Sequence, residues 1–276
     1  MTRRICRTVK ELVASVLLAS ALAAAHSVPA AAQPSDDFFQ VVFDVTPQAE
    51  PGFDQAFGYA VFIRYDGKQI LFDTGADPDV LAKNLARAGV NLKDLDAVAV
   101  SHRDMDHAGG LSLIRKARPD LKVIVPKGDT LDGGPVAPLA DHVRLSPNVH
   151  LIRTHVDKPA MGITDELSLV ITTQKGPYLI TACSHTGLPR IVDKAIEVTG
   201  QDVFFQTGGT MYKFRSMENT KSVARHLKKR KVAQVSPGHC GVDHGAMQLL
   251  KESWGDGYVA SKLGERVVLP PPAAGG

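Results

Sequence analysis

Residues 101–107 carry the densest group of chemically active side chains in this 276-residue sequence. The segment reads Ser-His-Arg-Asp-Met-Asp-His, which places four potential metal ligands within six residues: His102, Asp104, Asp106 and His107. Imidazole suits zinc and other borderline metals, while a carboxylate can bind a metal or orient a water beside it. A short apolar run at 96–100 precedes the segment, which predicts that the ligands stand where a buried strand ends.

Two more histidines occupy similar positions later in the chain. His185 lies in Cys-Ser-His-Thr-Gly and His239 in Pro-Gly-His-Cys-Gly, and each follows an apolar run. A metal cleft needs ligands from several loops, because one loop cannot surround an ion. The alternative is that Asp106 caps a helix and the histidines are ordinary surface residues.

Asp73 follows another apolar run and begins the turn Asp-Thr-Gly. Metal-bound imidazoles usually donate their second nitrogen to a carboxylate or a carbonyl. We therefore expect Asp73 to orient a ligand histidine rather than to bind the metal itself.

In this order, four features resemble the metallo-β-lactamase superfamily (MBL-fold metallo-hydrolases): the turn at 73–75, the motif at 102–107 followed by Gly-Gly-Leu, His185, and the late Pro-Gly-His. Cys183 and Cys240 resemble more narrowly the subgroup that includes ribofuranosylaminobenzene phosphate synthase. The resemblance implies an α/β fold, a four-layer αββα sandwich. It also implies one metal at His102 and His185 with help from Asp104, and a second at the remaining ligands: Asp106, His107 and His239.

Two departures from the family pattern affect the expected cofactor. The family motif usually has histidine where this chain has Asp104, and an added carboxylate favours harder metals. The family also often has an acidic or histidine ligand in a later loop, where this chain reads Gly-Gly-Thr-Met at 208–211. We expect one or two divalent ions, with zinc first and manganese or iron as alternatives.

The expected activity is hydrolysis of a small-molecule ester, lactone, lactam or phosphoester by a metal-bound hydroxide. A bound cation lowers the pKa of water from about 15.7 toward about 7. Asp106 would be the catalytic residue, because it would both bind the metal and orient the attacking water. Two alternatives stay open: a metal- or ligand-binding relative with little catalysis, and a transferase like the synthase.

The elements that must position these side chains follow from hydrophobic patterning and turn residues. Helices are expected at 78–88, 108–117, 188–198 and 217–229, with two further strand and helix steps closing the chain. Strands are expected at 38–45, 59–65, 68–72, 96–100, 121–125, 150–154, 167–172 and 178–181. The Gly/Pro-rich stretch 127–138 is interpreted as a surface loop, either a substrate lid or a plain connection, and the proline-rich tail 269–276 is expected to be disordered.

Residues 1–32 are predicted to be a signal peptide, which leaves 33–276 as a single domain. Four basic side chains stand near an apolar run at 12–25 that is short for a membrane span, and small residues precede position 33. An uncleaved anchor is the alternative. Removing 1–32 takes the formal net charge from +3 to zero. We therefore expect a periplasmic or secreted protein with no nucleic-acid partner and no stable membrane association after cleavage.

Two cysteines, Cys183 and Cys240, would remain after cleavage. They could form one disulfide, or they could stay reduced as small apolar residues. Either way the core must supply most of the stability.

Overall fold

The computed structural model describes residues 37–273, except 132 and 160. These residues belong to one compact unit that begins at Ser35. The predicted signal peptide lies outside the described residues. Within the described part of the chain, no helix is both long enough and apolar enough to cross a membrane.

In the described residues, thirteen strands form two mixed sheets. The first sheet has the spatial order β13 (Arg266–Val268), β1 (Phe38–Phe43), β2 (Ala60–Tyr65), β3 (Lys68–Phe72), β4 (Ala97–Ala99), β5 (Val123–Pro126), β6 (Val136–Leu139). The second has the order β12 (Gln234–Pro237), β11 (Phe205–Gly208), β10 (Gly176–Thr181), β9 (Asp165–Thr173), β8 (Val149–His155), β7 (His142–Ser146).

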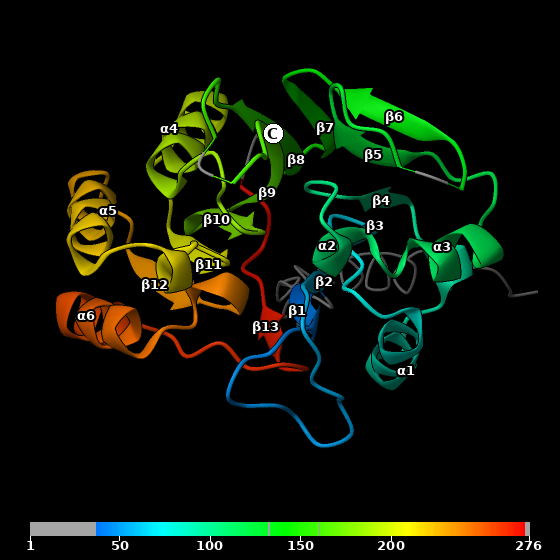
Figure 1. Ribbon diagram of the computed structural model, residues 1–276, viewed down its shortest axis with the longest axis horizontal. Coiled ribbons are helices and arrows are strands. Elements are labelled where there is room, and N and C mark those ends of the chain that lie inside the picture. The colour runs from blue at the N-terminus through cyan, green and yellow to red at the C-terminus, as the bar shows by residue number, and fades with distance from the viewer. Residues whose placement is uncertain (1–36, 132, 160, 274–276) are drawn as a thin grey trace, which may run out of the picture. The chain divides into compact units, whose positions relative to one another are not determined.

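Helices cover the outer face of each sheet (Figure 1). On the first sheet lie α1 (Pro78–Ala88) and α3 (Leu111–Ala117), and on the second lie α4 (Leu188–Thr199), α5 (Met217–Lys229) and α6 (His244–Trp254). The short α2 (Met105–Ala108) lies at the edge where the two sheets meet. The fold is therefore the expected αββα sandwich.

Three apolar clusters correspond to the three interfaces between these four layers. One cluster joins the facing sides of the two sheets, a second joins the second sheet to α4, α5 and α6, and a third joins the first sheet to α1 and α3. Strand alternation produces this division, because successive side chains point to opposite faces. In β2, Val61 and Ile63 face the other sheet, whereas Phe62 faces the helices.

Local sequence sets the bounds of α1 at the predicted residues. Asp77 caps the helix by accepting hydrogen bonds from the backbone N–H groups of Asp79 and Val80, and Pro78 occupies the first turn. Gly89 ends the helix in the left-handed conformation, with φ 77°.

The prediction of one helix at 108–117 was wrong in one respect, because the chain forms two helices in this region, α2 and α3. Gly110 interrupts them, and a Cβ at this position would lie 2.2 Å from the carbonyl oxygen of Thr74. Its N–H donates to the carbonyl of Gly75 over 3.1 Å. The break therefore lets the turn at 73–75 pack directly against the ligand-bearing segment.

The expectation of a disordered tail was also wrong, at least for its first residues. Leu269 is 1% exposed, and its N–H donates to the carbonyl of Asp37 over 2.9 Å. The hydroxyl of Tyr65 donates to the carbonyl of Pro270 over 3.0 Å. The loop at 127–138 was partly wrong as well, since its last residues belong to β6, which pairs with β5.

Candidate metal centre

Four loops carry residues of the site. Two follow parallel strands of the first sheet, and two follow parallel strands of the second sheet. In the first sheet β3 and β4 are parallel and lead to Asp73 and His102. In the second sheet β10, β11 and β12 are parallel, and β10 and β12 lead to His185 and His239. Parallel strands present their carboxyl ends at one edge, so distant parts of the sequence meet there.

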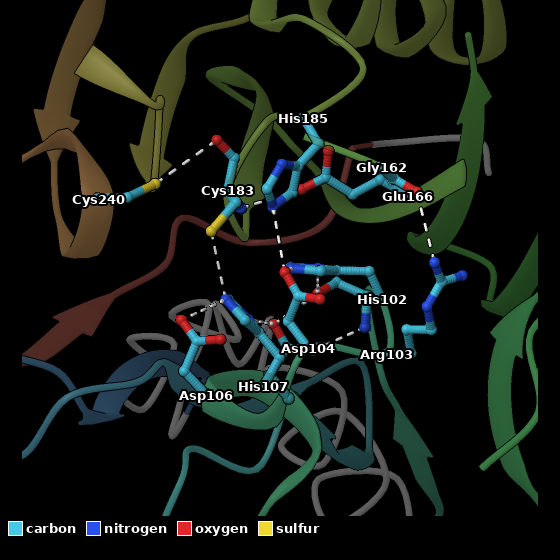
Figure 2. A network of polar contacts seen from close by, with 12 residues as sticks. His102, Arg103, Asp104, Asp106, His107, Gly162, Glu166, Cys183, His185 and Cys240 are labelled. Carbon is cyan, nitrogen blue, oxygen red and sulfur yellow. Dashed lines mark hydrogen bonds and ion pairs between the residues drawn. The ribbon is translucent and has the colours of Figure 1, made fainter. Parts of the chain in front are cut away.

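The six predicted ligands converge in two groups. The Oδ2 atom of Asp104 lies 3.5 Å from Nε2 of His102 and 3.8 Å from Nε2 of His185. The Oδ2 atom of Asp106 lies 3.5 Å from Nε2 of His107 and 3.3 Å from Nε2 of His239. The grouping is the one that the sequence resemblance implied, and Figure 2 shows both carboxylates directed toward the imidazoles.

Asp73 lies where it was expected, behind two of the histidines. Its Oδ2 atom accepts from Nδ1 of His107 over 2.8 Å and from the hydroxyl of Ser101 over 2.9 Å. Ser101 has one hydroxyl proton and gives it to Asp73, so its oxygen accepts from Nδ1 of His102 over 2.8 Å. Both Nε2 atoms are thereby left to face the other ligands, as metal coordination requires.

Within the described residues, the ring nitrogens that face this site include buried atoms without hydrogen-bond partners: Nε2 of His102 and Nε2 of His185. Leaving such groups unpaired costs free energy. The carboxylate-to-imidazole separations exceed an ordinary hydrogen bond, but they match the spacing of about 3.4 Å between two ligands of one tetrahedral ion. The donor set therefore fits divalent metal.

The buried negative charge of the site also favours a bound cation. Burial opposes protonation of His107, but the carboxylates of Asp73 and Asp106 outweigh it and raise its pKa to about 10. Burial also opposes ionisation of Asp106, yet His107 and His239 hold its pKa well below the usual range. Burial lowers the pKa of His185 to about 4, so this imidazole is neutral at neutral pH and can bind metal.

The backbone at the site adopts uncommon conformations. Non-glycine residues with positive φ include four that adjoin the ligands or are ligands: Asp73 (62°), Ser184 (65°), Met211 (57°) and His239 (48°). Such conformations cost of order 1–3 kcal/mol each and persist only where surrounding contacts enforce them.

Sequence reasoning missed two buried groups that hold the site. Glu166, from β9, accepts the N–H groups of Cys183 (2.9 Å) and Ser184 (2.7 Å) and so fixes the loop that carries His185. Asp44 accepts the N–H of His239 over 3.1 Å, and burial raises its pKa to about 7. A signal existed for both, because each is an acid within or directly after an apolar strand.

A third buried group at the site is the thiol of Cys183, which the sequence left either paired or reduced. Cys183 and Cys240 are both free and buried, so the disulfide alternative does not describe this structure. The neighbouring thiol of Cys240, together with burial, raises the pKa of Cys183 well above its usual range. The sulfur of Cys183 lies 3.3 Å from Nε2 of His107 (Figure 2).

A cavity of about 340 Å³ opens onto the two ligand groups. Asp104, Asp106, His185 and His239 contribute to its wall, and the rest of the wall is largely apolar. No described residue of the 127–138 stretch lines it, whereas Met161 from the loop between β8 and β9 does. The lid hypothesis for 127–138 therefore gains no support from the lining of this cavity.

The sequence profile described as the metallo-beta-lactamase superfamily matches residues 54–239. This match spans well over half of the chain and contains all six predicted ligands. The chain belongs to the metallo-beta-lactamase superfamily.

One curated relative and two solved structures are similar to this chain. The chain is 27% identical over 221 residues to 7,8-dihydropterin-6-methyl-4-(beta-D-ribofuranosyl)-aminobenzene-5'-phosphate synthase of Methanocaldococcus jannaschii, covering 63% of this chain and 75% of that protein. Tm1679, a metal-dependent hydrolase of the beta-lactamase superfamily, superposes with a TM-score of 0.68 at 22% identity, covering 85% and 99% of the two chains. A diphosphatase from the PhnP family superposes with a TM-score of 0.53 at 16% identity, covering 84% and 97%. The two structural likenesses bear on the fold alone.

Proposed function

We propose that this protein is a metal-dependent hydrolase of small molecules. The observation that carries the proposal is that two clusters, each made of one carboxylate and its neighbouring imidazoles, lie at the wall of a cavity of about 340 Å³. His102, Asp104 and His185 would hold one ion, and Asp106, His107 and His239 a second. A bound divalent ion supplies positive charge that acidifies water and stabilises developing negative charge.

The chain's own residues contribute positioning and proton handling. Asp106 lines the cavity and stays ionised, so its carboxylate can accept a hydrogen bond from the attacking water and orient it. Asp73 keeps His107 in one tautomer through the contact at Nδ1. Glu166 and Asp44 hold the backbones of the two loops from the second sheet.

The cavity wall favours an uncharged, partly apolar substrate. Apolar side chains dominate its rim: Val45, Phe57, Met161, Phe214 and Val242. Phe57 is 60% and Met161 52% exposed, so apolar surface is available to a ligand. Of the described residues that line the cavity, none is lysine or arginine. A phosphate would find no side-chain cation there, which favours esters, lactones or lactams over phosphoesters.

Zinc is the proposed ion, with manganese or iron as alternatives, because the donor set mixes imidazole with carboxylate. The proposed location is the periplasm or the exterior, on the strength of the basic and apolar pattern in residues 1–32. The proposed partner is the small-molecule substrate, without nucleic acid or stable membrane association.

A hydrolysis screen with the purified, zinc-loaded protein tests this function. Esters and lactones of increasing acyl length should be cleaved, with kcat/KM rising with acyl length, and phosphoesters should be poor substrates. His107→Ala should abolish cleavage, whereas His142→Ala, which alters an exposed histidine of β7, should not. Cleavage that survives in the His107 variant, or metal-free protein after loading, would refute the proposal.

A transferase is the second candidate, because the Methanocaldococcus relative is named as a synthase. The absence of a lysine or arginine among the described cavity-lining residues speaks against a phosphorylated substrate. Incubation with a phosphoribosyl donor and an aromatic amine, followed by product analysis, separates the two activities. A coupled product without hydrolysis would favour the transferase.

A further inference from the structure

We propose that Cys183 is a metal ligand shared by the two ion sites, an inference that rests on the metal binding proposed above. Two sets of donor atoms have all members within 4.8 Å of one another, and both contain the Cys183 sulfur. One set adds His102 and His185, and the other adds His107 and His239. The thiol therefore lies where both groups of ligands can reach it.

The separation between the Cys183 sulfur and the imidazole of His107 fits coordination of one ion. Two ligands of one tetrahedral zinc, a sulfur at about 2.3 Å and a nitrogen at about 2.0 Å, stand about 3.5 Å apart. The sulfur of Cys183 lies 3.3 Å from Nε2 of His107. Figure 2 shows this sulfur directed toward His107, and Cys183 also lines the cavity.

The backbone holds the thiol in this position. Glu166 accepts the N–H of Cys183 and that of the next residue, Ser184, whose φ is 65°. The hydroxyl of Ser184 donates to the carbonyl of Gly209 over 2.8 Å. These buried contacts fix the direction in which the Cys183 side chain leaves the loop.

The neighbouring loop after β11 offers no competing ligand. Residues 208–211 carry neither carboxylate nor imidazole. A Cβ at Gly209 would lie 1.8 Å from the carbonyl oxygen of Ala182, so the backbone there packs directly against the end of β10. A ligand between the two proposed ion sites would therefore come from the thiol in the loop after β10.

A thiolate ligand changes the expected metal. Binding would release the thiol proton to solvent, because a coordinating thiol is deprotonated. Thiolate favours zinc, cobalt(II) and cadmium over manganese, magnesium and other hard ions. Cys183 would therefore offset the preference for harder metals that Asp104 introduces.

Cys240 provides a matched control. It is a buried free cysteine beside His239, yet it belongs to neither donor set. Its sulfur accepts from the N–H of Met211 over 3.3 Å and donates to the carbonyl of Cys183 over 3.6 Å. Cys240→Ser makes the same chemical change as Cys183→Ser, but at a residue that is not a proposed ligand.

Cobalt(II) titration of the metal-stripped protein is the direct test. The unmodified protein and Cys240→Ser should show a near-ultraviolet thiolate-to-cobalt charge-transfer band, and Cys183→Ser should lack it. Loss of a ligand should weaken cobalt binding at least about tenfold. Circular dichroism checks that each variant is folded. A band that persists in Cys183→Ser would overturn the proposal.

Zinc-edge X-ray absorption keeps the test decisive if Cys183→Ser does not fold. In Cys6→Ser/Cys240→Ser, Cys183 is the one remaining cysteine, and zinc should still show a sulfur neighbour. Zinc bound with only nitrogen and oxygen neighbours would refute the shared thiolate while leaving the hydrolase proposal intact. Failure to bind zinc at all would refute both.

Discussion

Buried carboxylates fix the orientation of the proposed ligand histidines. Asp73 is fully buried and accepts three hydrogen bonds, from His107 and from the N–H and hydroxyl of Ser101. A negative charge in this position both fixes the tautomer of His107 and increases its basicity as a ligand. The proposed metal centre therefore depends on a residue outside its set of ligands.

Replacing Asp73 by Asn should weaken metal binding without removing any ligand. The amide is similar in shape but carries no charge, so affinity for zinc should fall by about 10–100-fold. Competition with a chromophoric chelator measures this affinity. Lys68→Gln, which removes an exposed ion pair with Asp96 on the same sheet, serves as the control and should leave affinity unchanged.

Asp44 makes the stability of the metal-free protein depend on pH. Burial raises its pKa in the folded protein to about 7, above the ordinary value of 3.8. Between these two values the folded chain binds a proton that the unfolded chain does not, so this carboxyl lowers stability as the pH rises from about 4 to 7.

Asp44→Asn should remove that dependence. The variant should gain little at about pH 4 and up to a few kcal/mol above pH 7, because one pKa unit corresponds to about 1.4 kcal/mol. Urea unfolding of both proteins at the two pH values, with chelator present, provides the measurement. An equal stability difference at both pH values would contradict the assigned pKa.

At the scale of elements, the strand ends determine where the ligands meet. The loops after β10, β11 and β12 pack side by side because these strands are parallel and in register. The β11 loop supplies no ligand, but its backbone supports the loops on either side. The N–H of Gly238 donates to the carbonyl of Gly208 over 3.0 Å, which links the His239 loop to β11.

Gly209→Ala should disturb this packing. The added Cβ would lie 1.8 Å from a backbone oxygen and 2.8 Å from the sulfur of Cys240, so the loop must shift. The free energy of unfolding should fall by about 1–3 kcal/mol. In the control Gly245→Ala, the new Cβ meets only the flexible end of Met217 at 2.8 Å and a side-chain oxygen at 3.5 Å, so chemical denaturation should show little loss.

At the scale of the whole molecule, neither sheet carries all of the proposed metal ligands. The first sheet supplies the ligands at 102–107, while the second supplies Cys183, His185 and His239. The N–H of Leu167 also donates to the carbonyl of Ser101 over 2.9 Å, which joins the sheets beside the site. Bound metal would therefore clamp the two halves of the sandwich together.

Metal binding should accordingly stabilise the fold. At free zinc of about 100 times the Kd, the gain should be about 2.7 kcal/mol. For a chain of this size, this corresponds to a rise in Tm of roughly 5–10 °C. Thermal unfolding with zinc and then with chelator measures it. In His107→Ala/His185→Ala the rise should disappear, and an equal rise there would locate the binding elsewhere.

The sequence by itself determined the layer pattern and indicated the six residues that are proposed as ligands. Strand alternation and capping residues act locally, so β3, α1 and α5 form at the predicted residues. Ligand types are likewise legible in short motifs such as the one at 102–107. The break at Gly110 could not be predicted this way, because its cause is the approach of Thr74, which is distant in sequence.

Only the tertiary structure decided how the ligands are supported and joined. Glu166 and Asp44 act through backbone N–H groups 17 and 195 residues away, and no local pattern pairs them with His185 or His239. The position of the Cys183 sulfur between the two histidine groups depends on how two sheets pack. Side-chain type is written in the sequence, but distance between remote side chains is set by the packing of the core.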